Sequence, residues 1–107
     1  MSDMIHIPEG SYAVIFIADL ADDTGYGEMA NRMVELAQTM PGYIAVESQR
    51  GAAGRGITVS YWETEADILN WKRNTEHLEA QRTGRKRFYS QFTLQVAKVE
   101  RSYHMKK

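Results

Sequence analysis

The sequence has 107 residues, the length of one domain, and its 43% hydrophobic and 25% charged residues are ordinary for a globular protein. A net charge of −1 creates no field that would attract nucleic acid or anionic lipid, so neither is an expected partner. The absence of cysteine excludes disulfides, thiolate catalysis and thiolate metal sites.

Residues 1–10 are predicted to form a lead-in arm, punctuated by Pro8 and Gly10. The arm lacks the basic and apolar regions of a signal peptide, and no apolar run approaches the ~18 residues of a membrane span. We therefore expect a cytoplasmic protein without a membrane partner. His6, in the arm, is expected to be exposed.

The next two segments predict a strand and a helix. Residues 12–20 (YAVIFIADL) are apolar at nearly every position, which indicates a strand buried on both faces. In the following turn, Asp22, Asp23 or Thr24 is expected to cap a helix. Residues 26–40 carry apolar side chains at helical spacing, and Pro41-Gly42 ends this amphipathic helix.

Residues 43–50 and 57–62 predict an antiparallel hairpin around a glycine-containing turn at residues 51–55. The glycines permit the positive φ angles that such turns need. Since successive side chains of a strand alternate, Tyr61 and Trp62 point to opposite faces. At most one of them therefore faces a cavity beneath helices.

The C-terminal half predicts two helices and a strand. Residues 63–73 form a helix with a capping box made by Thr64 and Asp67. Asn74 or Thr75 is expected to cap a further helix, which runs from residue 76 to about residue 88. Residues 91–103 predict the last strand, in which the break in alternation calls for a bulge near Ala97 or Lys98.

This order of elements is βαβ followed by βαβ, the split-βαβ arrangement of ferredoxin-like α+β folds, with helices on one face of a four-stranded antiparallel sheet. The strand at residues 12–20 also offers apolar side chains to the open face. A soluble monomer does not tolerate an open apolar sheet. We therefore expect a homodimer packed through its sheet faces, which makes a barrel-like assembly.

The chain resembles the antibiotic biosynthesis monooxygenase family of dimeric α+β barrels over about residues 11–104 of a single domain, 1–107. The segments that carry the resemblance are ITVSYW (57–62), the spacing from Trp62 to Trp71, EHLEAQ (76–81), GRKRFY (84–89) and VAKVERSY (96–103).

The resemblance implies oxidation of a small aromatic, quinol-like molecule by dioxygen, with no flavin, haem or metal cofactor. The alternative is a non-catalytic ligand-binding or stress-related dimer with the same cavity. Haem-degrading relatives use an Asn on the first strand, a Trp on the second helix and a His ten residues later. Trp71 matches that Trp, but Gln81 stands at the His position and residues 13–18 contain no Asn, so haem degradation is not expected.

The candidate catalytic residues are His77 and Trp71. His77 is either a general base, for which its ordinary pKa is suited, or a histidine at a helix start bonded to a nearby carbonyl or to the other subunit. Trp71 is either a platform for an aromatic substrate or part of the core. The candidate substrate-binding residues are Tyr61, Trp62, Glu47, Arg85 and Tyr89.

The basic run from Arg82 to Arg87 offers two interpretations. It could hold an anionic substrate, or it could form a solvated helix face or ion pairs between subunits. The sequence favours the second interpretation, because exposed basic runs on helices are usually solvated.

Overall fold

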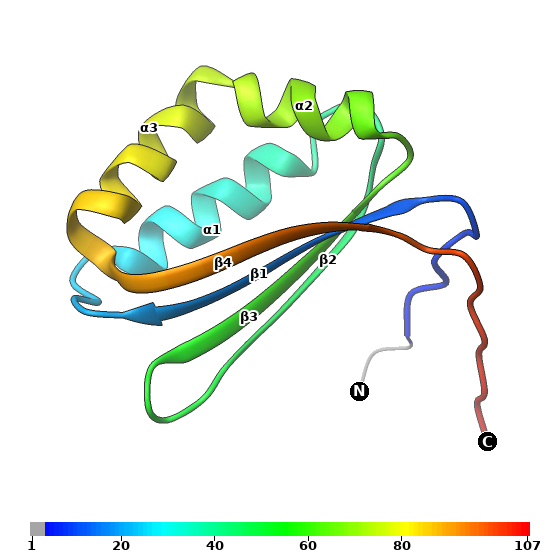
Figure 1. Cartoon of the computed structure of the whole chain (residues 1–107), viewed down its shortest axis with the longest axis horizontal. Helices are drawn as coiled ribbons and strands as arrows, with labels where there is room; N and C mark the ends of the chain where they lie inside the picture. Colours follow the sequence, from blue (N-terminus) through cyan, green and yellow to red (C-terminus); the bar gives the residue numbers. More distant parts are fainter. Residues whose placement is uncertain (1–3) are drawn as a thin grey trace.

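A four-stranded antiparallel sheet with its helices on one face makes up the fold in the computed structural model, which describes residues 4–107 (Figure 1). The sheet order is β2-β3-β1-β4. This confirms the predicted ferredoxin-like α+β architecture. In chain order the elements are β1 (Tyr12–Leu20), α1 (Tyr26–Ala37), β2 (Tyr43–Arg50), β3 (Arg55–Trp62), α2 (Glu65–Arg73), α3 (Thr75–Thr83), the π-helix η1 (Gly84–Phe88) and β4 (Tyr89–Lys98).

The strand register defines two faces of the sheet. Phe16 of β1 lies opposite Thr58 of β3 and Leu94 of β4. The Phe16 ring contacts Tyr89, whose ring in turn contacts Tyr26 of α1, so this set of residues faces the helices. The alternate set forms an open face, on which the apolar side chains of the two central strands are Ile15, Ile17, Ile57, Val59 and Tyr61.

Trp62 is the largest fully buried side chain in the described residues. Its indole lies against Tyr43 and Trp71, and its N–H donates to Ser60 Oγ at 3.0 Å, so burial leaves no donor unpaired. The residue thus joins the end of β3 to the helix layer. As predicted, Tyr61 and Trp62 point to opposite faces, with Trp62 toward the helices.

The start and end of α1 differ from the prediction. Gly25, with φ of 81°, occupies the N-cap and makes no capping bond, whereas the Asp22 carboxylate accepts a bond from the Thr24 N–H inside the turn. The helix ends at Ala37 rather than Met40. Its last N–H groups, at Thr39 and Met40, bond carbonyls three residues back, which tightens the final turn out of α-helical geometry.

The predicted capping box of α2 is present, since Thr64 Oγ1 accepts a bond from the Asp67 N–H at 3.1 Å. The helix begins at Glu65, two positions later than expected. Asn74 caps α3, because its Oδ1 accepts the His77 N–H at 3.1 Å. This settles the choice between Asn74 and Thr75.

The helix expected to run to residue 88 instead changes to the π-helix η1 at Gly84. A Cβ atom at this glycine would lie 2.6 Å from the Tyr89 ring, so only glycine permits the close approach. The chain then enters β4 at Tyr89, two residues before the predicted start, and the strand ends at Lys98.

The bulge expected near Ala97 or Lys98 was wrong. The register of β1 and β4 is regular there and shifts instead at Asp19 and Leu20, at the other end of the pair. One residue past Lys98 the pairing is irregular, but in the partner segment: Val99 N–H bonds the Ser11 carbonyl and Gly10 N–H bonds the Val99 carbonyl, each at 2.8 Å. Gly10, with φ of 87°, and Ser11 thus lie opposite the single residue Val99, as in a bulge. No helix in residues 4–107 is both long and apolar enough to cross a bilayer.

Replacing Trp62 with alanine should lower the free energy of unfolding by about 3–5 kcal/mol, because a fully buried indole leaves a cavity at the junction of β3 and α2. Leu69→Ala is the control: Leu69 on α2 is 45% exposed, and its truncation should cost far less. Urea denaturation of the two variants gives the comparison. Equal losses of stability would contradict the central position of Trp62.

Candidate functional site

The first candidate cluster is a column of rings where α2 meets α3. Trp71 of α2 stacks on Trp62, with 5.9 Å between ring centroids and 25° between planes. His77 of α3 also stacks on Trp71, with 4.1 Å between ring centroids and 12° between planes. Tyr43 of β2 meets Trp62 edge-on at 5.8 Å. Four elements therefore contribute one ring each to a single aromatic column, which consists of Tyr43, Trp62, Trp71 and His77.

The hydrogen bonds of His77 fix its tautomer. Its Nδ1 lies 3.0 Å from the Trp71 carbonyl oxygen, which can only accept, so Nδ1 carries the proton. The Nε2 lone pair is then the basic atom of the ring. Burial lowers the pKa of His77 below its ordinary value, and the bond to the Trp71 carbonyl opposes this shift. The imidazole is therefore neutral at neutral pH.

The second cluster is aromatic as well and lies where η1 enters β4. Tyr89 contacts Phe16, Tyr26 and Phe92 at centroid distances of 5.3, 5.8 and 5.8 Å. The Tyr89 hydroxyl is 3.4 Å from the Tyr26 hydroxyl, to which it donates, and Arg50 Nη2 donates to the same oxygen at 3.2 Å. Burial, aided by the bond to Tyr26, raises the pKa of Tyr89 well above its usual range, so this phenol stays protonated.

The basic run is only partly neutralised. Arg82 pairs with Glu79 at 2.8 Å, and Arg87 pairs with Asp22 at 3.6 Å. Arg85 instead lies with its guanidinium carbon 6.0 Å from the centroid of the Phe92 ring. A groove of about 240 Å³ follows one side of α3 and η1, and its lining residues are Leu78, Gln81, Arg82, Arg85 and Lys86.

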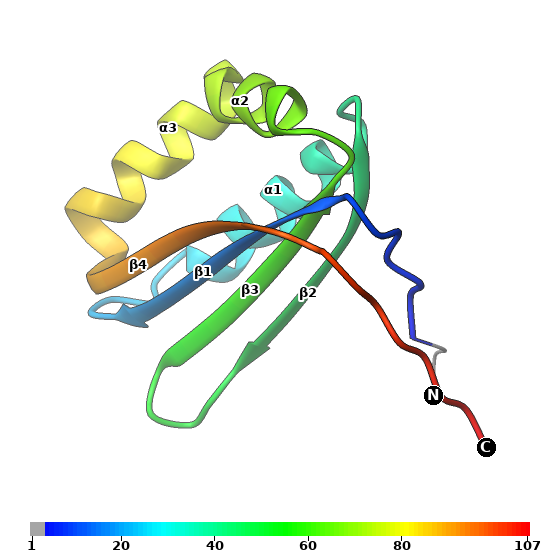
Figure 2. The ribbon, with the colours of Figure 1, turned by 45° about the vertical axis from the view of Figure 1, so that its right-hand side comes forward.

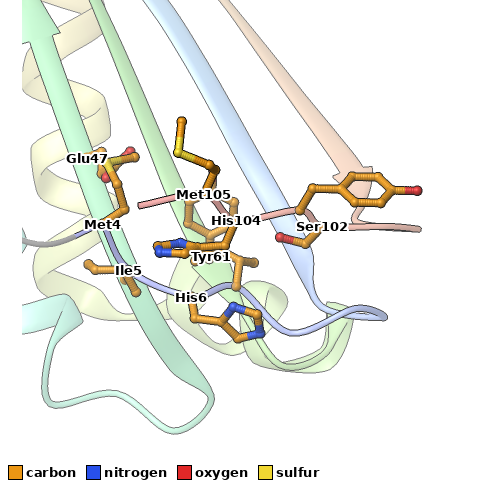
Figure 3. Close-up of a pocket in the computed structure, with 11 residues that line it drawn as sticks. Met4, Ile5, His6, Glu47, Tyr61, Ser102, His104 and Met105 are labelled. Atoms are coloured by element: carbon orange, nitrogen blue, oxygen red, sulfur yellow. The ribbon is translucent and has the colours of Figure 1, made fainter. Parts of the chain in front are cut away.

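Tyr61 and Glu47 lie elsewhere, on the open face of the sheet. Together with Ala45 and both terminal arms they line a cavity of about 320 Å³. Figure 3 shows His6 of the N-terminal arm and His104 and Met105 of the C-terminal arm beside them. The described residues contain no group of three or more His, Cys, Asp or Glu placed to hold a metal ion.

The structure thus distributes the seven predicted site residues over three places. It brings together Trp62, Trp71 and His77. Arg85 and Tyr89 each lie near Phe92, whereas Tyr61 and Glu47 lie together on the open face. Sequence reasoning missed the contributions of Tyr43, Tyr26 and Arg50. Their partners are distant in the chain, and no local spacing announces the contacts.

Residues 22–83 match the model of the antibiotic biosynthesis monooxygenase family, and the chain belongs to that family. A protein of Bacillus subtilis (strain 168), the uncharacterized protein YqjZ, is 52% identical over 91 residues, which cover 84% of this chain and 80% of YqjZ.

Two solved structures share the fold at low sequence identity. SnoaB of Streptomyces nogalater, described as a cofactor-independent oxygenase, matches with a TM-score of 0.76 and 7% identity, covering 87% of this chain and 96% of SnoaB. PA3566 of Pseudomonas aeruginosa matches with a TM-score of 0.73 and 9% identity, covering 87% of this chain and 96% of PA3566. At these identities the likeness defines the fold alone.

The lowered pKa of His77 predicts a specific pH dependence of stability. Because the folded state binds this proton less readily than the unfolded chain, the free energy of unfolding is highest above pH 6.5 and falls as the pH drops below that value toward the lowered pKa. His77→Asn cannot titrate but keeps an N–H for the Trp71 carbonyl. Urea denaturation at about pH 8 and about pH 5.5 should show the larger loss in the wild type. An equal loss in both proteins would contradict the shift, since His6 and His104 are common to them.

Proposed function

We propose that this protein is a cofactor-independent monooxygenase that oxidises an electron-rich, quinol-like aromatic compound with dioxygen on the helix side of the sheet. The observation that carries the proposal is the pairing of Trp71 with His77, a flat apolar ring directly against a neutral imidazole whose Nδ1 is occupied. Family membership and the fold shared with the oxygenase SnoaB support it.

The chemistry requires a proton acceptor and a dry aromatic site rather than a metal. In the keto tautomer of an anthrone-like compound, a ring CH₂ loses a proton because the resulting carbanion is delocalised onto the carbonyl oxygen as a phenolate, and this electron-rich anion transfers an electron to dioxygen. Recombination and loss of water then convert CH₂ to C=O, with one oxygen atom in the product and the other in water. The substrate supplies all four electrons, so the equation balances without another reductant.

His77 is the proton acceptor in this proposal. Its neutral state at neutral pH follows from burial, and its bond to the Trp71 carbonyl directs basicity to Nε2. The Nδ1 bond and the stack on Trp71 restrict the ring, and the Asn74 cap holds the backbone at His77, which reduces the reorganisation needed for proton transfer. Because Trp62 and His77 stack on Trp71, the substrate ring would pack against the part of this half-buried indole that the column leaves uncovered.

A second candidate function rests on the same hydrogen bond. If the bond of His77 to Trp71 serves only to join α2 to α3, the protein is a non-catalytic binder of small aromatic ligands. This candidate differs from the first in one measurable respect, since the ligand would bind without consumption of oxygen.

His77→Asn should reduce the turnover of an anthrone, which carries the ring CH₂ that the reaction needs, by about 10²–10⁴, because the variant retains the bond to Trp71 and loses the base. The measurement is oxygen uptake over a panel of hydroquinones and anthrones, with the melting temperature as a control for folding. Arg32→Gln, which breaks the solvent-exposed pair between Arg32 of α1 and Glu76 of α3, is the matched control and should retain activity. Full activity of His77→Asn would show that the histidine is structural.

We further propose that the active form is a homodimer joined through the open faces of two sheets. The apolar side chains that β1 and β3 present on that face support this proposal. Ile57, for example, is 46% exposed in the single chain and would be covered in the dimer. Burial of roughly 1,500 Å² in such an interface would exceed the cost of association if most of the area is apolar. The cavity at Tyr61 and Glu47 lies on this face, so both residues would be close to the partner.

Sedimentation at micromolar concentration should therefore show twice the chain mass of 12.2 kDa. Ile15→Asp, which puts an unpaired charge on the open face, should abolish the dimer or prevent folding. Leu69→Asp on the exposed side of α2 is the control and should remain dimeric. A stable monomer of the wild-type chain would refute the assembly.

A further inference from the structure

The edge strand β4 exposes an unusual row of apolar side chains toward the helix layer. Phe92, Leu94 and Val96 are 38%, 50% and 45% exposed although they lie on the same face as Phe16, which the helices cover. In both ribbon views α3 and β4 diverge from the turn at η1 (Figures 1 and 2). This apolar row of Phe92, Leu94 and Val96 therefore forms the floor of an open side of the molecule.

One cation, Arg85, lies above the Phe92 end of this row. Arg85 lies over the Phe92 ring and also lines the groove along α3 and η1, together with Lys86 and Leu78. Among residues 4–107, neither Arg85 nor Lys86 has a carboxylate within ion-pair distance, whereas their neighbours Arg82 and Arg87 are paired. The groove consequently carries two uncompensated positive charges beside an apolar surface.

This positive charge is local to the groove, because the chain as a whole is not basic. The net charge of the protein is −1, so the basic run is a local departure from an otherwise balanced surface. A planar guanidinium recognises a carboxylate through two parallel hydrogen bonds, and an aromatic ring packs well on exposed Phe, Leu and Val side chains. One molecule that has both groups would satisfy both parts of the site.

We propose that the substrate of the proposed monooxygenase is an aromatic carboxylate, with its ring on the apolar row and its carboxylate held by Arg85 and Lys86. This inference rests on the proposed function and defines its substrate class. The groove begins at Leu78, the residue after His77, so a multi-ring substrate anchored at Arg85 extends along α3 toward the column that contains Trp71. Arg85 and Lys86 are positioning residues in this arrangement.

Three probes of one shape test the charge requirement: 2-naphthoate, 2-naphthalenemethanol and 2-naphthylmethylamine, titrated into the full chain by calorimetry. We expect the carboxylate to bind about tenfold or more tightly than the alcohol, and the amine to bind most weakly. The preference for the carboxylate should decrease as salt is added. Equal affinity for the carboxylate and the alcohol would overturn the proposal.

Substitutions in the basic run test which residues cause the preference for the carboxylate. Arg85→Gln combined with Lys86→Gln should abolish the preference for 2-naphthoate while leaving the affinity for the alcohol nearly unchanged. Arg87→Gln removes a charge two residues from Arg85 that pairs with Asp22 and lies outside the groove lining, so it should keep the preference. If Arg87→Gln weakens 2-naphthoate as much as the double variant does, the net charge of the segment is responsible and the groove is not the site.

The outcome is separable from that of the proposed function. His77→Asn should bind 2-naphthoate like the wild type, because the lining of the groove includes Arg85 and Lys86 but not His77. Carboxylate-selective binding through Arg85 without oxygen uptake for any aromatic acid or hydroquinone would uphold the anchor and refute the monooxygenase. Oxygen uptake with neutral hydroquinones in a protein that shows no preference for the carboxylate would refute the anchor and uphold the monooxygenase.

Discussion

The burial of one indole, that of Trp62, is the contact on which the helix layer depends. Trp62 ends β3, and α2 rests on it through Trp71. His77 then stacks on Trp71 and bonds its carbonyl, which determines where α3 begins relative to α2. The position of the proposed base therefore depends on the sheet through two rings, those of Trp62 and Trp71. Stability and the geometry of the candidate site share the same contacts.

The two aromatic clusters perform different physical tasks. The column at Trp71 is closely stacked and contains a neutral base, whereas the cluster around Tyr89 contains two phenols and the guanidinium of Arg50. The first suits removal of a proton, and the second supplies hydrogen-bond donors near the turn into β4. Both lie on the helix side of the sheet, so the open face is left for contact with a second copy in the assembly that we propose.

The sequence predicted the features that depend on neighbouring residues in the chain. The bounds of β1 and β2, the capping box at Thr64 and the opposite orientations of Tyr61 and Trp62 follow from alternation and capping, and the structure contains all of them. The π-helix at Gly84 and the bulge at Asp19 depend on the approach of Tyr89 to its neighbours, which no spacing encodes. For the same reason the sequence pointed to His77 and Trp71 but not to Tyr43, which meets Trp62 in the same column. The roles of these residues stay predictions.

The π-helix has a consequence for comparing this chain with its relatives. A turn closed by bonds from residue i to i+5 contains one residue more than an α-helical turn, so side chains after Gly84 are rotated relative to a helix that continues regularly. The match to the family model ends at residue 83, immediately before this turn. With a relative whose helix continues regularly, an alignment drawn without a gap here would equate Arg85 with a side chain that points in another direction. Positional equivalence downstream should therefore be assigned by superposition.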